Sequence, residues 1–145
     1  LDRGADVGVT NKDGFNALWY AILGVDGNGK DKAPNERVIR LLLDAGADPN
    51  KRRNHLGLGS PTPLYWASEH GYEHAVAALL DNGADVDKTA LMFHAHMGNE
   101  DMVNLLIEHG ADVRATDNAG NTAVEHAFEA GHERIAQTLL ECREE

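Results

Sequence analysis

Residues 76–85 read Val-Ala-Ala-Leu-Leu-Asp-Asn-Gly-Ala-Asp, an apolar stretch that ends in a Gly-Ala-Asp triplet. Val76, Leu79 and Leu80 have the i, i+3, i+4 spacing of the buried stripe of a helix. A glycine directly after such a stripe can take the left-handed backbone conformation that ends a helix. The triplet begins at Gly4, Gly46, Gly83 and Gly110, so the glycines are 42, 37 and 27 residues apart. The sequence therefore predicts repeated helical units.

A second set of similar segments lies between the triplets, at residues 16–21, 62–67, 89–95 and 122–127. Each begins with Thr or Asn, whose side-chain oxygen can cap the first turn of a helix. Pro63 falls at the first helical position, where its missing N–H is not needed. In the last three units the segment runs on to a glycine, at Gly71, Gly98 and Gly131. Each unit is thus predicted to be a helix, a tight turn, a second helix and a connecting finger.

These landmarks resemble the ankyrin-repeat family, whose pattern places Thr-Pro-Leu-His, Gly-His and Gly-Ala-Asp within about 33 residues. The resemblance covers almost the whole chain and includes four sets of landmarks in order. It implies an all-α ankyrin-repeat solenoid, made of helix–turn–helix repeats with short hairpin-like fingers. It also implies protein–protein binding through the fingers and the inner helices, without catalysis.

The expected organisation is one ankyrin-repeat domain over residues 1–145. Its expected parts are the end of a truncated upstream repeat (1–10), a repeat with an interhelix insert at 26–35 (11–50), a repeat with an extended finger (51–87), a repeat with a shortened finger (88–114) and a C-terminal capping repeat (115–145). The insert accounts for nine residues beyond the family period and the extended finger for four. The shortened finger, at 86–88, lacks six residues, either genuinely or because residues are missing from the chain.

The helix that should pair with residues 1–3 is expected upstream of Leu1, because a repeat array needs a polar cap at its end. At the other end, Ile135, Leu139 and Leu140 form a last apolar stripe before a polar terminus. No Gly-Ala-Asp triplet follows this stripe, as expected of a terminal repeat.

The charge balance excludes several classes of partner. The chain carries 24 acidic and 13 basic side chains, a formal net charge of -11. Nucleic acids and anionic membrane surfaces both require clustered Lys and Arg, so neither is an expected partner. Cys142 is the only cysteine, which rules out an internal disulfide and fits a reducing compartment, so a cytoplasmic monomer is expected.

Two departures from the family pattern concern histidine. Trp19, Tyr65, Met92 and Glu125 stand where the family has the His of Thr-Pro-Leu-His, so a hydrogen-bond network attributed to that His does not carry over. Conversely, His94 stands where the family places Ala. We expect His94 to be half-buried with a hydrogen-bond partner, the alternative being a tuned pH switch.

No catalytic, cofactor or metal site is predicted, and the chain is not expected to be an enzyme. Residues 24–30 fit the spacing of a phosphate-binding loop, but Asp31 replaces the hydroxyl residue and a helix precedes them. A calcium loop in the same insert has Lys30 at its fifth position, where an oxygen ligand is needed. The histidines His70, His96 and His126 lie in successive repeats, too far apart for one zinc ion.

The candidate partner-binding residues on the first helices share one face by i, i+3, i+4 spacing. They are Tyr20, Leu23, Trp66, Glu69, His70, Phe93, His96, Met97, His126 and Glu129. Tyr20, Trp66, Phe93 and His126 would form a row across four repeats on the concave side that the family resemblance implies. Aromatic side chains in a groove are favoured binding hot spots. Packing between neighbouring repeats is the alternative role of these rings, and the two roles are compatible.

The fingers contribute the remaining candidates, which are Lys12, Asp13, Phe15, Arg52, Arg53, His55, Asn118 and Asn121. Residues 51–53, Lys-Arg-Arg, are the only run of three basic side chains. This run could bind an acidic or phosphorylated segment, or it could be an ordinary solvated loop. The acidic C-terminal half is expected to favour a basic partner.

The predicted function is a protein–protein interaction module whose partner is another protein. The alternative is an interaction or scaffolding domain cut from a larger enzyme or bacterial effector, whose catalytic part lies outside this chain.

Overall fold

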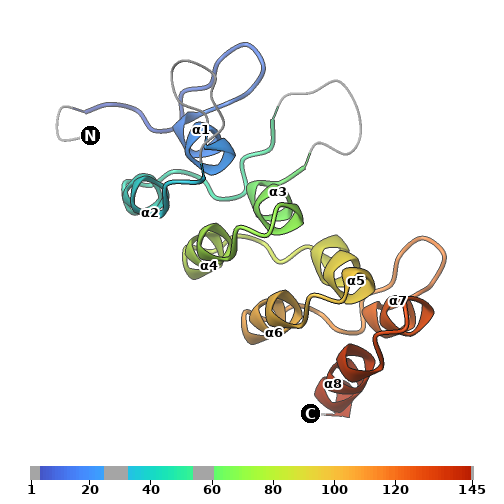
Figure 1. The fold of residues 1–145 in the computed structure, drawn as a ribbon. Coiled ribbons are helices and arrows are strands. Elements are labelled where there is room, and N and C mark those ends of the chain that lie inside the picture. The colour runs from blue at the N-terminus through green and yellow to red at the C-terminus, as the bar shows by residue number, and fades with distance from the viewer. Residues whose placement is uncertain (1–3, 25–32, 54–60, 145) are drawn as a thin grey trace. The chain divides into compact units, whose positions relative to one another are not determined.

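The computed structural model describes residues 4–24, 33–53 and 61–144 (Figure 1). Within these ranges the chain forms eight helices and no strands, which confirms the all-α prediction. In chain order the helices are α1 (Ala17–Leu23), α2 (Glu36–Asp44), α3 (Pro63–Glu69), α4 (Glu73–Asp81), α5 (Lys88–Met97), α6 (Glu100–Glu108), α7 (Ala123–Glu129) and α8 (Glu133–Glu144). In these ranges no helix combines the length and the apolar character needed to cross a membrane.

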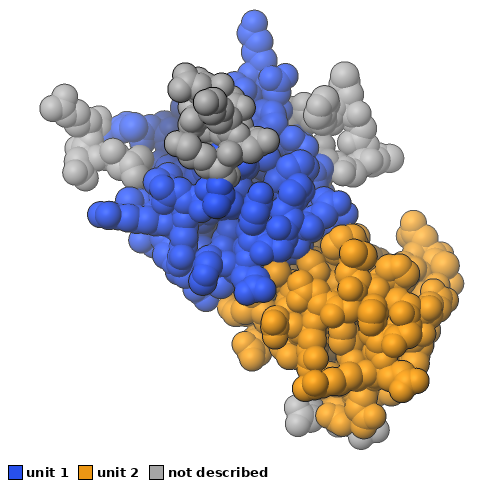
Figure 2. All heavy atoms as spheres, viewed as in Figure 1, with its two compact units in different colours: residues 1–85 blue, residues 86–145 orange. Residues whose placement is uncertain are grey.

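The helices divide between two compact units, residues 1–85 and residues 86–145 (Figure 2). In the first unit α1 packs against α2, α3 packs against α4, and α2 and α4 also touch. In the second unit α5 packs against both α6 and α7, and α7 packs against α8. Each unit therefore consists of two consecutive helical hairpins, as the repeated landmarks predict.

The first helices begin at the predicted caps in three of the four repeats. Asn16 Oδ1 accepts the N–H of Trp19 at 3.0 Å, and Thr62 Oγ1 accepts the N–H of Tyr65 at 3.1 Å. Thr122 forms a capping box, in which Glu125 reaches back to the backbone of Thr122. These contacts satisfy N–H groups that a helix terminus leaves without partners.

The third repeat corrects the prediction that Thr89 is the cap. Helix α5 begins at Lys88, and Asp87 Oδ1 accepts the N–H of Thr89 at 2.9 Å. The carboxylate of Asp87 takes over because it comes directly before the first helical residue in a short connection.

The predicted apolar stripes form the core, with two exceptions. Helix α4 buries Val76, Leu79 and Leu80, and helix α6 buries Met102, Val103 and Leu106. Val38 of α2 and Leu140 of α8, by contrast, are 39% and 41% exposed. Leu140 belongs to the last predicted stripe, and Val38 precedes the buried Ile39 of α2. At 3.6 residues per turn a run of adjacent apolar positions is wider than the face that a neighbouring helix covers.

His94 of α5 differs from the prediction of a half-buried side chain with a partner. It is only 3% exposed, and its Nε2 atom has no hydrogen-bond partner. Burial lowers the pKa of His94 to about 4, since a charged imidazolium would lose its hydration there. The side chain is therefore a neutral part of the core at physiological pH.

Gly98 ends α5 with a φ of 77°, and its neighbour makes this glycine harder to replace than the others. A Cβ atom added there would lie 2.5–2.9 Å from three ring atoms of His132. At Gly110, with a φ of 86°, a Cβ would meet nothing within 4 Å. We expect Gly98→Ala to lower the free energy of unfolding by at least about 1 kcal/mol more than Gly110→Ala, because only Gly98→Ala adds overlap to backbone strain.

Urea denaturation of the two glycine variants tests this expectation. The double variant Gly98→Ala/His132→Ala removes the imidazole ring of His132. It should therefore abolish the extra loss of unfolding free energy that Gly98→Ala shows relative to Gly110→Ala. Equal losses in the two single variants would contradict the role assigned to the His132 contact.

Part of the predicted insert lies outside the described residues. So do residues 25–31, where the phosphate-binding and calcium-binding interpretations were rejected from the sequence. Of residues 26–35, the structure describes Ala33, Pro34 and Asn35. Asn35 Oδ1 accepts the N–H of Val38 at 3.2 Å, so the end of the insert caps α2.

Candidate partner-binding surfaces

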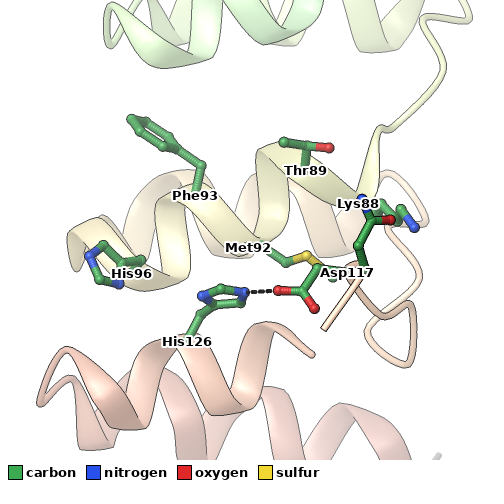
Figure 3. Close-up of a pocket in the computed structure, with 8 residues that line it drawn as sticks. Lys88, Thr89, Met92, Phe93, His96, Asp117 and His126 are labelled. Atoms are coloured by element: carbon green, nitrogen blue, oxygen red, sulfur yellow. Dashed lines mark hydrogen bonds and ion pairs between the residues drawn. The ribbon is translucent and has the colours of Figure 1, made fainter. Parts of the chain in front are cut away.

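The second unit contains a cavity of about 480 Å³ between α5, α7 and the finger that precedes α7 (Figure 3). Its lining includes four residues predicted from the sequence, which are Phe93, His96, Asn118 and His126. The lining also includes Lys88, Thr89, Met92 and Asp117, which the sequence analysis did not select. Thr89 lies four residues before Phe93, and Met92 lies four residues before His96, so helical spacing could have identified these two α5 residues.

Helix α5 lines the cavity with the apolar side chains of Met92 and Phe93. Met92 is 7% exposed, and in Figure 3 its side chain extends from α5 toward Asp117. Phe93 is half-buried and borders the cavity, with its ring 5.1 Å from that of His94 in an edge-on arrangement. Met97, one turn after Phe93, is 61% exposed and lies outside the lining.

A hydrogen-bonded pair, Asp117 and His126, closes the opposite side of the cavity. His126 Nε2 lies 2.9 Å from Asp117 Oδ2, and the rings of His126 and His96 are 6.4 Å apart. Asp117 Oδ1 accepts the backbone N–H groups of Ala119 at 2.8 Å and Asn121 at 2.9 Å. The carboxylate therefore shapes the finger and faces α7 at the same time.

The same contacts keep Asp117 ionised. The hydrogen bond from Asn121 is the largest cause that lowers the pKa of Asp117, and the bonds from His126 and Ala119 act in the same direction. Lys88, at the start of α5, donates from Nζ to the carbonyl of Thr116 at 2.7 Å. The cavity thus combines apolar side chains with one fixed carboxylate, one ammonium group and two imidazoles.

The unit that contains this cavity is acidic as a whole. Residues 86–145 carry 12 acidic and 4 basic side chains, a balance of -8, whereas residues 1–85 carry 12 and 9, a balance of -3. Most of the net charge of -11 therefore belongs to the second unit. Glu129, predicted as a site residue, is exposed on α7 outside the cavity lining.

In the first unit two predicted aromatic residues, Phe15 and Trp66, pack with Trp19 around the side chain of Arg53. The guanidinium carbon of Arg53 lies 4.9 Å from the ring centre of Phe15, 5.1 Å from that of Trp19 and 5.4 Å from that of Trp66. Arg53 Nε is buried and has no hydrogen-bond partner. We call Phe15, Trp19 and Trp66 the arginine seat. The structure places Arg53 in this seat, rather than in the solvated loop that was one of its two predicted roles.

Further ring contacts continue from the arginine seat. Trp66 stacks on His70 at 4.3 Å, and Phe15 lies 5.7 Å from Tyr20. Tyr20 remains 45% exposed, and its hydroxyl accepts a hydrogen bond from Asn11 at 2.9 Å. Of the predicted row of rings, Tyr20 and Trp66 therefore already make contacts with other side chains of the first unit.

The other predicted residues of the first unit lie apart from the arginine seat. Lys12 and Asp13 are exposed in the finger turn, where Asn11 Oδ1 accepts the N–H of Asp13 at 3.0 Å. Leu23 is half-buried, and Glu69 and Arg52 are exposed. His55 lies outside the described residues. Across the described ranges, no group of three or more His, Cys, Asp or Glu side chains is arranged to hold a metal ion.

A model for ankyrin repeats (three copies) matches residues 1–89 and 64–145 of the chain. The chain is 30% identical over 115 residues to a transient receptor potential cation channel subfamily A member 1 homolog of Caenorhabditis elegans, covering 76% of this chain and 9% of the channel. It is 34% identical over 108 residues to the E3 ubiquitin-protein ligase XBAT33 of Arabidopsis thaliana, covering 70% of this chain and 21% of the ligase.

A third relative is the ankyrin repeat and SOCS box protein 5 of Oryctolagus cuniculus, 41% identical over 86 residues. That match covers 56% of this chain and 25% of the relative. The chain therefore spans a quarter or less of the length of each of these three proteins.

Proposed function

Because the chain belongs to the ankyrin-repeat family, we propose that it is a protein–protein interaction module whose second unit presents the partner-binding groove. Its fold class is the all-α ankyrin-repeat solenoid, and ankyrin repeats generally bind other proteins. The observation that carries the proposal is the cavity of about 480 Å³ in the second unit, bordered by Phe93 and the finger residue Asn118.

The contrast between the two units supports this placement. In the first unit Arg53 already covers Trp66, the counterpart of Phe93 in its repeat. In the second unit Phe93 borders an open cavity, with the exposed Met97 one turn away. Aromatic and methionine side chains in a concave site are efficient anchors for a partner. A partner that docks here would cover apolar surface now in contact with water, which favours binding.

The charge of the second unit defines the class of partner. A balance of -8 attracts a basic protein segment and repels acidic ones, nucleic acids included. We propose a monomeric module, and its single cysteine, Cys142, fits the reducing cytoplasm.

A second candidate function is that of an interaction or scaffolding domain within a larger enzyme or effector. The relatives support it, since one is named an E3 ubiquitin-protein ligase and another, from Lachancea kluyveri, a palmitoyltransferase. The chain covers 21% of the first and 15% of the second. The full-length reading frame distinguishes the candidates, because an adjoining catalytic domain would favour the second.

Phe93→Ala should weaken the binding of a peptide that docks in this cavity about 30-fold, which is the effect of removing one hot-spot side chain. Peptides selected from a displayed library on the whole chain supply the ligand, and calorimetry supplies the affinity. Phe128→Ala is the matched control, because Phe128 is 54% exposed in the same unit but does not line the cavity. Equal affinity of the Phe93→Ala and unmodified proteins for every selected peptide would refute the groove.

A further inference from the structure

The fingers before α3 and before α7 begin with the same backbone turn. Asp48 Oδ1 accepts the N–H of Asn50 at 2.8 Å, and Asp112 Oδ1 accepts that of Arg114 at 2.9 Å. In both fingers the carbonyl of the aspartate also accepts the N–H three residues on, at 3.3 Å and 3.2 Å. The two aspartates are therefore structural counterparts, and counting five residues on from each pairs Arg53 with Asp117.

The flanking helices have counterparts as well. Counting from the Thr or Asn at the start of each repeat pairs Trp19 with Met92 and Trp66 with His126. In the first unit Arg53 lies against Trp19 and Trp66. In the second unit Asp117, Met92 and His126 all line the cavity. In the first unit the guanidinium of Arg53 fills the space between Trp19 and Trp66. The equivalent space in the second unit, between Met92 and His126, is an open cavity that the carboxylate of Asp117 lines.

On this basis, and resting on the proposed function, we propose that the cavity of the second unit binds an arginine side chain of a basic partner segment. Asp117 supplies the opposite charge, and Met92 and the His126 ring supply the apolar and planar surfaces that contact the guanidinium. The arginine seat shows that this repeat design holds a guanidinium between its finger and two successive first helices. Arginine is preferred over lysine because its planar group both stacks and donates in several directions.

Asp117 has the capacity for this contact. A carboxylate offers about four acceptor positions. Three are used by Ala119, Asn121 and His126. The Asp117 side chain remains 29% exposed, so solvent and ligands reach it. A guanidinium N–H can take the remaining position without breaking the finger or the pair with His126.

Lys88 sets a limit on the electrostatic contribution. Its ammonium group also lines the cavity and is held by the carbonyl of Thr116, so the charges of Lys88 and Asp117 offset each other in part. The surrounding balance of -8 steers the basic segment toward the unit, and the direct contact with Asp117 selects arginine within it.

The test uses the whole chain and synthetic versions of the library-selected peptides, with each arginine replaced in turn by citrulline, lysine or leucine. Citrulline keeps the shape and removes the charge. At one position we expect citrulline to weaken binding roughly tenfold or more, the effect of losing a charged hydrogen bond. In Asp117→Asn, the arginine and citrulline peptides should bind within about twofold of each other.

Asp112→Asn is the matched control, because it removes one negative charge from the same finger outside the cavity. It should keep the preference for arginine, and circular dichroism should show equal folding of both variants.

If leucine replaces every arginine without loss of affinity, or if Asp112→Asn and Asp117→Asn behave alike, the proposal of an arginine-binding cavity is wrong. Peptides that need Phe93 but no arginine leave the proposed groove standing, whereas peptides insensitive to Phe93→Ala refute the groove itself. The citrulline comparison on the unmodified protein stands even if a variant fails to fold.

Discussion

Trp19→Ala is expected to lower the free energy of unfolding of the first unit by about 3–5 kcal/mol, the range for removing a large buried aromatic side chain. Trp19 is fully buried in α1, and its Nε1 donates to the carbonyl of Lys51 at 2.7 Å. Its ring is also one wall of the arginine seat that holds Arg53. The substitution therefore opens a core cavity and releases the finger at the same time.

The measurement is urea unfolding followed by tryptophan fluorescence. Both tryptophans, Trp19 and Trp66, belong to the first unit, so in the variant the signal comes from Trp66 alone. Tyr20→Ala is the control, because the adjacent side chain is 45% exposed. It should cost at most about 1 kcal/mol. A Trp19→Ala loss no larger than that of Tyr20→Ala would show that the contacts of Trp19 contribute little.

Acid should destabilise the protein through His94, by up to about 3 kcal/mol. Burial lowers the pKa of His94 from 6.5 to about 4 in the folded protein. Above pH 6.5 the side chain is neutral in both states and the effect is absent. Between pH 6.5 and 4 the unfolded chain binds the proton first, so stability falls as the pH falls, and the loss levels off below pH 4. A difference of about 2.5 pKa units, at 1.36 kcal/mol each, gives the stated size.

His94→Gln tests this effect, because glutamine has a comparable polar side chain that does not titrate. The free energy of unfolding is measured from pH 7.5 to 4 for the unmodified protein and the variant, and the difference between the two curves isolates His94 from the carboxylates. Parallel curves for His94→Gln and the unmodified protein would show that His94 is not buried in a neutral form.

The candidate site was predictable in part. Phe93 and His96 line one cavity, and residues three or four apart on a helix face the same way. His126, at the place in the next repeat that Phe93 has in its own, lines the same cavity. Asp117 was missed because its place in the finger depends on hydrogen bonds to Ala119 and His126, which spacing on a helix does not reveal. Trp66 and Phe93 have equivalent places in their repeats, yet Trp66 lies against Arg53 whereas Phe93 borders the cavity.

The helices, the caps at Asn16, Thr62 and Thr122, and the order of the repeats could all be predicted from the amino-acid sequence. These features depend on residues within a few positions of one another, where periodicity and capping chemistry act locally. Two contacts became visible only in the folded chain: Trp19 donates to Lys51, 32 residues away, and Arg53 lies against three rings. The physical reason is that the exposure of a side chain depends on which distant atoms cover it, so equivalent positions became a filled seat in one unit and an open cavity in the other.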